Sequence, residues 1–203
     1  MKKIKAIFFD LGGVVLTQSL EARFEVIAEV FKKEKKDIEE IFKKYNKDWT
    51  IGKLSVETLA KRLIKEFDIK QSTTQILKNW KKVYQNKTLP NKQLLIKIDN
   101  LRKNYDLYLL TNTVDLHHRV NSKRDIFIHF NKVFASHIIG IKKPEQDFYI
   151  HVLRELKLKP EECVFVDDIK ENIDAARDLG IDGIIFQNNN QLFKEFKKRK
   201  IAI

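Results

Sequence analysis

The sequence predicts an α/β protein, a mainly parallel sheet core with an inserted block of four helices. Short apolar runs recur near residues 4–10, 107–110, 133–135, 164–166 and 183–186. From the second run onward, segments with helical periodicity separate the runs, and such alternation produces right-handed crossovers and a parallel sheet. Between the first and second runs the periodicity is helical alone, which predicts an all-helical insertion.

The first apolar run, residues 4–10, ends at Asp10 and is followed by Gly12 and Gly13. This pattern predicts a buried strand that enters a tight turn. Four amphipathic helices are then predicted, because apolar side chains recur at helical spacing. They are Phe24, Ile27, Ala28 and Phe31; Ile38, Ile41, Phe42 and Tyr45; Leu59, Leu63 and Phe67; and Ile76, Leu77, Trp80 and Tyr84. We expect a helical cap domain at 18–87 and a Rossmann-like core made of 1–17 and 88–203.

The rest of the chain predicts an alternation of helices and strands. Pro90 marks the exit from the helical block, and Gly180 ends a later helix. The expected elements are a helix at 91–103, a strand at 107–110, a helix at 114–130, a strand at 133–135, a helix after Pro144, a strand at 164–166, a helix at 170–179, a strand at 183–186 and a helix at 190–199.

The chain is strongly basic, with a formal net charge of +12. Clustered lysines would indicate a nucleic-acid partner, because they displace counterions from phosphate backbones. Here the lysines are spread over nearly every amphipathic segment and mostly alternate with glutamate, and no nucleic-acid-binding module is recognisable. We therefore expect solvated helix faces and no nucleic-acid partner, with a field that attracts small anions.

The N-terminal lysines before Ile7, Phe8 and Phe9 resemble a secretory leader, but Asp10 interrupts the apolar stretch. No apolar run reaches the roughly 18 residues of a membrane helix. Cys163 is the single cysteine, which excludes an internal disulfide. These features predict a cytoplasmic protein without a membrane partner, and they leave monomer and homodimer equally open.

Polar residues stand where the predicted strands end: Asp10, Thr111 with Asn112, and Asp167 with Asp168. Ligands of open parallel sheets bind outside the carboxyl ends of the strands, so we expect these residues to meet at one edge. Asp10 and Asp168 would repel each other there unless a cation neutralised them. Hard oxygen donors and an anionic ligand favour Mg²⁺, which needs only one or two protein carboxylates. The sequence therefore predicts a Mg²⁺ site.

Four segments resemble the motifs of haloacid dehalogenase-like hydrolases. Residues 8–15 resemble the first motif, residues 110–112 the second, residues 143–144 the third, and residues 164–168 with Asn172 the fourth. Each segment alone is also an ordinary turn or helix cap, but all four occur in order. The resemblance points to the branch with the sugar-phosphate phosphatases and the N-terminal phosphatase domain of soluble epoxide hydrolases, whose small helical cap lies between the first two motifs.

The resemblance implies a phosphatase that uses covalent catalysis with Mg²⁺ as cofactor. Asp10 would attack phosphorus to give an aspartyl-phosphate. Asp10, Asp168 and the Gly12 carbonyl would bind the metal. The substrate implied is a small phosphorylated metabolite, and a sugar phosphate is the first expectation.

The resemblance also assigns residues to the phosphate group. The Thr111 hydroxyl and the Asn112 amide would hold its oxygens, together with the loop at Gly12 and Gly13. Lys143 would orient the nucleophile and stabilise charge on the transferred group. Asp167 would orient either the metal-bound waters or the lysine.

Gly12 departs from the pattern of most phosphatases in the superfamily, which carry a second aspartate there as general acid and base. Such help is worth about 10²- to 10⁴-fold in rate. His117 is a candidate substitute. In related caps the loop around Trp49 and Lys53 faces the active site, so both residues are candidates for substrate contact.

Two further hypotheses remain open. The first, motivated by Gly12, is a catalytically weak protein of this fold that binds a phosphorylated ligand. The second is a haloacid dehalogenase, in which the same aspartate displaces halide. That chemistry needs no metal, so the presence of Asp168 argues against it.

Overall fold

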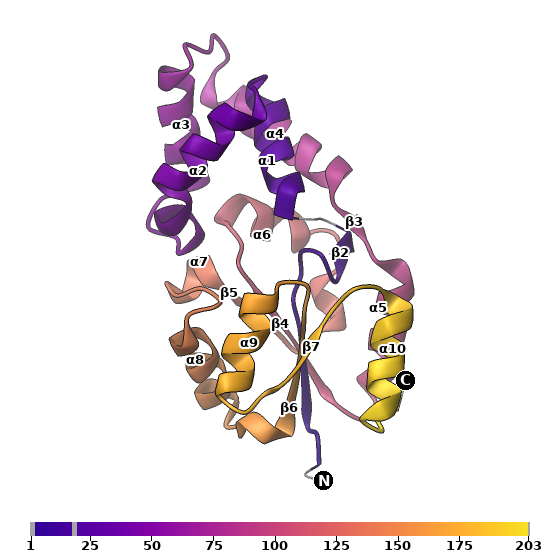
Figure 1. Cartoon of the computed structure of the whole chain (residues 1–203). Coiled ribbons are helices and arrows are strands. Elements are labelled where there is room, and N and C mark those ends of the chain that lie inside the picture. The colour runs from indigo at the N-terminus through magenta and orange to yellow at the C-terminus, as the bar shows by residue number, and fades with distance from the viewer. Residues whose placement is uncertain (1–2, 18–19, 203) are drawn as a thin grey trace.

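Five parallel strands form the central sheet of the computed structural model, which describes residues 3–17 and 20–202, without the side chains of 20–23 and 42 (Figure 1). Their order across the sheet is β5 (Lys132–Ala135), β4 (Asp106–Thr111), β1 (Ala6–Phe9), β6 (Cys163–Asp167) and β7 (Asp182–Ile185). β1 is central and pairs with both β4 and β6, and all four of its residues are buried. A continuous apolar run is the expected sequence for such a strand, because both of its faces are covered.

Helices cover both faces of the sheet. On one face, α5 (Lys92–Leu101) and α10 (Asn189–Lys198) share an apolar core with Ile7 and Phe9. On the other face, α8 (Gln146–Leu156) and α9 (Lys170–Asp178) share a core with Ala6 and Phe8. Successive side chains of β1 therefore enter opposite cores, as the two-residue period of a strand requires.

Four helices form a separate layer beyond the carboxyl ends of the strands (Figure 1). They are α1 (Leu20–Phe31), α2 (Lys35–Thr50), α3 (Val56–Glu66) and α4 (Thr73–Lys87). Side chains set two of the starts: Ser55 accepts from the Thr58 amide, and Ser72 forms a capping box with Gln75. The expected boundary at residue 18 lies outside the described residues.

A short antiparallel ladder joins the two ends of this helical layer. It pairs β2 (Leu16–Thr17), which enters the layer, with β3 (Leu89–Pro90), which leaves it. Neither strand is predictable from the sequence, because two residues are too few to show a periodicity. The chain therefore enters and leaves the helical layer at one place.

Helix α6 (Asp115–Asn121) follows β4 but packs with the helical layer. Its buried residues Leu116 and Val120, with Val114 directly before it, belong to the same apolar cluster as α1 to α4. The Trp80 indole donates to His117 Nε2 over 3.2 Å, and the Asn121 amide donates to the Tyr84 hydroxyl over 2.8 Å. The link between the two layers is therefore both apolar and polar.

The predicted fold class is confirmed, but one predicted helix is wrong. Instead of a helix over 114–130, α6 ends at Asn121, and only a 3₁₀ turn, Phe127–His129, follows. Asp125 has a φ of 54°, which is left-handed backbone and cannot continue a right-handed helix. Besides β2 and β3, the sequence does not predict α7 (Ser136–Ile139), directly after β5, or a 3₁₀ turn at Pro160–Glu162. Within the described ranges, no helix is long and apolar enough to span a bilayer.

Candidate active site

The site lies at the carboxyl ends of three neighbouring strands. Asp10 directly follows β1, Thr111 ends β4 and Asp167 ends β6. The Asp10 amide donates to the Val166 carbonyl over 2.8 Å, which fixes the start of the loop after β1 against β6. All three residues are buried. The sheet thus brings together residues that are far apart in the sequence.

Lys143 is the centre of the site. Its Nζ donates to Asp10 Oδ1, to Asp167 Oδ2 and to the Leu110 carbonyl, each over 2.7 Å. The residue is only 2% exposed, so the three acceptors replace the water that its ammonium would otherwise bind. A buried ammonium with three acceptors is held in one position.

Asn112 holds the backbone of Lys143. Its Nδ2 donates to the Lys143 carbonyl over 2.7 Å, and its Oδ1 accepts from the Lys143 amide over 2.9 Å. This pair of bonds fastens the loop before α8 to the end of β4. The family resemblance implies phosphate binding for the Asn112 amide and does not include this bond pair, for which a sequence offers no signal. One amide hydrogen of Asn112 remains for a ligand.

Asp167 is fixed from several sides. Oδ1 accepts from the Ile169 amide over 2.8 Å, and Asn172 Nδ2 lies 3.1 and 3.0 Å from its two oxygens. With Lys143 at Oδ2, this carboxylate has donors on both oxygens. Asp167 therefore helps to hold the Lys143 ammonium in place in this structure.

Asp168 lies beside Asp10 and Asp167 at the same edge. One carboxylate oxygen from each of the three aspartates lies within 4.8 Å of the others. Three carboxylates against one ammonium leave two negative charges when all are ionised. This oxygen-rich, negatively charged corner matches the ligands that a hard divalent cation prefers.

Gly13 makes room for Asp168. A Cβ on this glycine would lie 2.2 Å from Asp168 Oδ2, and its φ is +87°. Both the space and the backbone conformation therefore require glycine. Gly13 therefore has a role beyond a turn, since it lets the loop after β1 approach the carboxylate.

Burial changes the acid strength of these groups. Burial, with the charges of Asp167 and Asp168, raises the pKa of Asp10 to about 7, although Lys143 lowers it. Burial alone would lower the pKa of Lys143, but the charges of Asp10 and Asp167 outweigh it and raise that pKa. The ammonium therefore stays charged, and a further cation would favour the ionised form of Asp10.

The candidates His117 and Trp49 lie in an aromatic cluster of the helical layer. The His117 ring stacks on Tyr84 at 3.8 Å, and its Nε2 accepts from Trp80. Trp49 is 4% exposed, and its ring meets those of Trp80 and His117 edge-on. Lys53, by contrast, is exposed. Any proton transfer by His117 would have to use Nδ1, because Nε2 is engaged.

Ser136 was not a candidate, but it joins the layers near the site. Its hydroxyl lies 2.6 Å from the Thr50 carbonyl and 3.2 Å from the Thr113 carbonyl, and it accepts from the Thr113 amide over 3.1 Å. It thus links the end of α2 to the loop after β4. A lone serine after a strand carries no sequence signal for this role.

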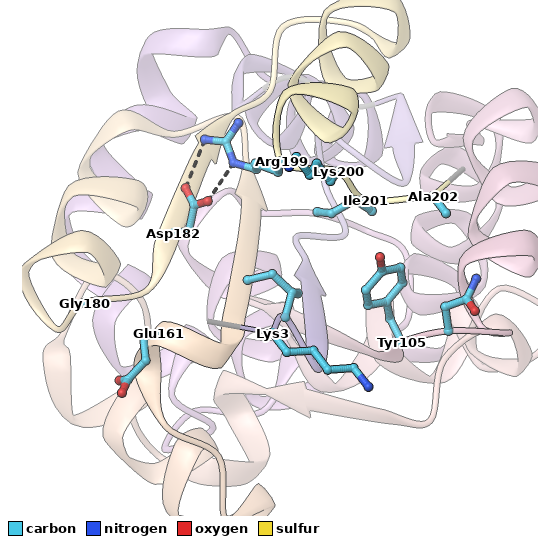
Figure 2. A pocket seen from close by; sticks show the side chains of 11 residues that line it. Lys3, Tyr105, Glu161, Gly180, Asp182, Arg199, Lys200, Ile201 and Ala202 are labelled. Atoms are coloured by element: carbon cyan, nitrogen blue, oxygen red, sulfur yellow. Dashed lines mark hydrogen bonds and ion pairs between the residues drawn. The ribbon is translucent and has the colours of Figure 1, made fainter. Parts of the chain in front are cut away.

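A cavity of about 800 Å³ lies at the opposite end of the sheet. Figure 2 shows the paired side chains of Arg199 and Asp182 in its wall, near Lys3 and Tyr105. Tyr105 precedes β4 and Asp182 begins β7, so the cavity borders the amino ends of the strands. Its size therefore does not mark the site, because the convergent polar groups lie at the carboxyl ends.

A sequence profile of the haloacid dehalogenase-like hydrolases matches residues 4–180. This chain is a haloacid dehalogenase-like hydrolase. The match extends over four of the five strands of the central sheet, all except β7, and over the helical layer, and it includes all four segments in which the sequence resembles the family motifs.

Relatives of this hydrolase include named phosphatases. It is 24% identical to D-ribitol-5-phosphate phosphatase from Bacteroides thetaiotaomicron, over 92% of this chain and 93% of that protein. It is 24% identical to bifunctional epoxide hydrolase 2 from Sus scrofa, over 96% of this chain but 38% of that protein. The chain spans less than half the length of several curated relatives.

A solved structure of a haloacid dehalogenase family enzyme from Bacteroides thetaiotaomicron, a magnesium complex, is also similar. Its sequence is 25% identical, the match covers 95% of this hydrolase and 99% of that chain, and the TM-score is 0.80. Fold and family thus agree with the expectation from the motifs.

Proposed function

We propose that this hydrolase is a magnesium-dependent phosphomonoesterase that acts on a small phosphorylated metabolite, with Asp10 as its nucleophile. One observation carries the proposal: the buried ammonium of Lys143 contacts both Asp10 and Asp167, with Asp168 beside them. Such an arrangement fixes a carboxylate beside a buried ammonium, which can orient it for attack on a phosphate.

The residues fit a magnesium ion. The three carboxylate oxygens within 4.8 Å of one another are hard donors, and the site carries more negative than positive charge. Asp10, Asp168 and the carbonyl of Gly12 would hold the ion. When bound, Mg²⁺ would offset the repulsion between a carboxylate and a phosphate and polarise a phosphoryl oxygen.

The chain's own groups carry out the transfer. A carboxylate oxygen of Asp10 forms a bond to phosphorus, the ester P–O bond breaks, and the leaving alkoxide takes a proton from solvent water to give the alcohol. Water then attacks the aspartyl-phosphate, which releases inorganic phosphate and restores Asp10. Lys143 orients the nucleophile, and the Thr111 hydroxyl and the remaining amide hydrogen of Asn112 bind phosphate oxygens.

We further propose that residues 18–87 act as a cap. The helical layer stands over the carboxyl ends of the strands, and Ser136 connects the end of α2 with the core (Figure 1). A cover at this place would exclude water while the phosphoryl group moves to Asp10. The name of the Bacteroides thetaiotaomicron relative supports a sugar or polyol phosphate as the substrate.

The decisive measurement is release of nitrophenol from p-nitrophenyl phosphate with Mg²⁺ and with a chelator. Turnover should need the metal. It should fall by about 10³-fold or more in Asp10→Asn and Asp168→Ala, and by roughly 10²-fold or more in Lys143→Met. Lys170→Met, which changes an exposed lysine paired with Asp174, is the control and should keep its activity. Metal-independent turnover, or an active Asp10→Asn variant, would reject the proposal.

A second candidate follows from Gly12, which leaves no carboxyl group at that position. A protein that binds a phosphorylated ligand with little turnover would keep the cation and phosphate contacts and lack the general acid. Calorimetric binding of Mg²⁺ and inorganic phosphate, without release of nitrophenol, would support this alternative.

A further inference from the structure

A second cavity, of about 470 Å³, lies between the helical layer and the core. From the helical layer it is lined by the α1 residue Phe24 and by Glu39, Lys43, Asn46 and Lys47 of α2, and from the core by Lys142. Its volume falls within the range of small-ligand pockets. The wall of the cavity is therefore built by residues of both layers.

The residue that lines the core side of this cavity, Lys142, is the sequence neighbour of the central lysine of the proposed active site. Lys142 immediately precedes Lys143, whose Nζ lies 2.7 Å from Asp10 Oδ1. Successive Cα atoms are only about 3.8 Å apart. A substrate bound at Asp10 would have to extend past the backbone of this loop to place a second group in the cavity.

The cavity is positively charged, with three lysines against one acid, Glu39. In the part of the chain that the structure describes, none of the ion pairs involves Lys43, Lys47 or Lys142. The next residue along α2, Lys44, does have a partner, Glu66 at 3.9 Å. Among the described residues, the positive charge of this lining is therefore not offset by ion pairs.

Two of the three lysines lie close together because of their spacing on α2. Lys43 and Lys47 are four residues apart, so they lie on the same face of the helix, where like charges destabilise each other. Lys142 approaches from a different element. An anion between them would relieve this repulsion and could accept hydrogen bonds from ammonium groups of both layers.

We propose that this cavity binds a second anionic group of the substrate. The preferred substrate class is then a phosphate monoester that also carries a carboxylate or a second phosphate. Asn46 and Glu39 stand beside the lysines to bind neighbouring hydroxyl groups. This inference rests on the proposed phosphomonoesterase function and assigns its specificity to Lys43, Lys47 and Lys142.

Matched substrate pairs test the inference. The first pair is glucose 6-phosphate and 6-phosphogluconate, which differ at one carbon that carries a carboxylate in the second compound. The second pair is fructose 6-phosphate and fructose 1,6-bisphosphate. The wild type should show a kcat/KM about tenfold or more higher for the more anionic member of at least one pair. The pair with the preference identifies the anion.

The variant Lys43→Met/Lys47→Met should lower this preference roughly tenfold, because methionine keeps the stem and removes the charge. Lys142→Met should lower it as well. The control is Lys44→Met/Lys61→Met, which removes the same charge from lysines paired with Glu66 and Glu57. The control should keep the wild-type preference, because it changes only the overall field.

Each result bears on one of the two proposals. No preference in the wild type, an unchanged preference in Lys43→Met/Lys47→Met, or an equal loss in the control would overturn the anion subsite and leave the phosphatase intact. A wild type that hydrolyses neither the sugar phosphates nor p-nitrophenyl phosphate with Mg²⁺ would overturn both. Thermal unfolding of each variant confirms that it is folded, and Lys47→Gln replaces any variant that is not.

Discussion

Gly13 and the Asp168 carboxylate compete for the same space. Gly13→Ala would place a Cβ 2.2 Å from Oδ2 and would keep a non-glycine residue at a φ of +87°. We expect a free energy of unfolding lower by about 1 to 3 kcal/mol, from the backbone strain. We also expect an apparent Mg²⁺ affinity lower by about tenfold or more, because the displaced carboxylate is a proposed ligand. Urea unfolding and metal titration of turnover measure the two effects.

Gly140 offers a matched control for this substitution. Its φ is +83°, but a Cβ there would meet nothing within 4 Å. Gly140→Ala should therefore lose stability through backbone strain alone and keep the wild-type metal dependence. Equal metal dependence in both alanine variants would show that Gly13 does not control the position of Asp168.

The residues that the sequence could place are those fixed by the ends of strands. Asp10, Thr111 and Asp167 were located correctly, because the carboxyl ends of parallel strands share one edge. The bonds of Asn112 to Lys143, which is 31 residues away, were not predictable, since no periodicity or motif encodes them. The position of His117 beside Trp80 likewise depends on how α6 packs, which is decided by the tertiary fold.

Helices α6 and α7 meet through two histidines whose ring centroids are 5.0 Å apart. Burial lowers the pKa of His118 and, together with the charge of His118, lowers the pKa of His137 below the ordinary 6.5. Below pH 6.5 the unfolded chain therefore binds protons that the folded chain resists, and stability falls as pH falls. Partial exposure limits the effect to a few tenths of a kcal/mol to about 1 kcal/mol.

The test compares the free energy of unfolding at pH 7.5 and 5.5. The variant His118→Gln/His137→Gln should lose less stability between these values than the wild type. Ile138→Gln, which changes a 67% exposed residue of α7, should behave like the wild type. The test must compare variants with the wild type, because Asp10 contributes a pH dependence of the opposite sign. Its pKa is raised in the folded protein, so its contribution to the free energy of unfolding grows as pH falls.

Boundaries of elements were predicted less well than their existence. The four helices of the inserted layer were visible because their apolar positions repeat over several turns. The end of α6 was not, because the polar stretch after Asn121 continues a plausible helical pattern until the left-handed backbone at Asp125. Strands β2 and β3 form only because their two segments meet in the folded chain. Local sequence carries little information on such contacts.

The grouping of elements into apolar clusters does not follow their order along the chain. α6 follows β4 in sequence, yet Val114, Leu116 and Val120 pack with α1 to α4. We therefore expect α6 to open together with the helical layer under mildly destabilising conditions. In native-state hydrogen exchange, the amides of α6 should follow the urea dependence of α4 amides. Exchange of α6 in step with the amides of β4 would contradict this expectation.

The pairing of Thr17 with Leu89 has a consequence for modularity. The two ends of the insertion lie side by side, so a tight two-residue hairpin loop would suffice to close the chain in its absence. The backbone would thus tolerate excision or exchange of the whole insertion. The apolar face of α6 opposes such an excision. A protein without the insertion would expose this face to solvent and would be prone to aggregate. A replacement module would have to bring a complementary face, so this helix and the insertion are expected to evolve as a pair.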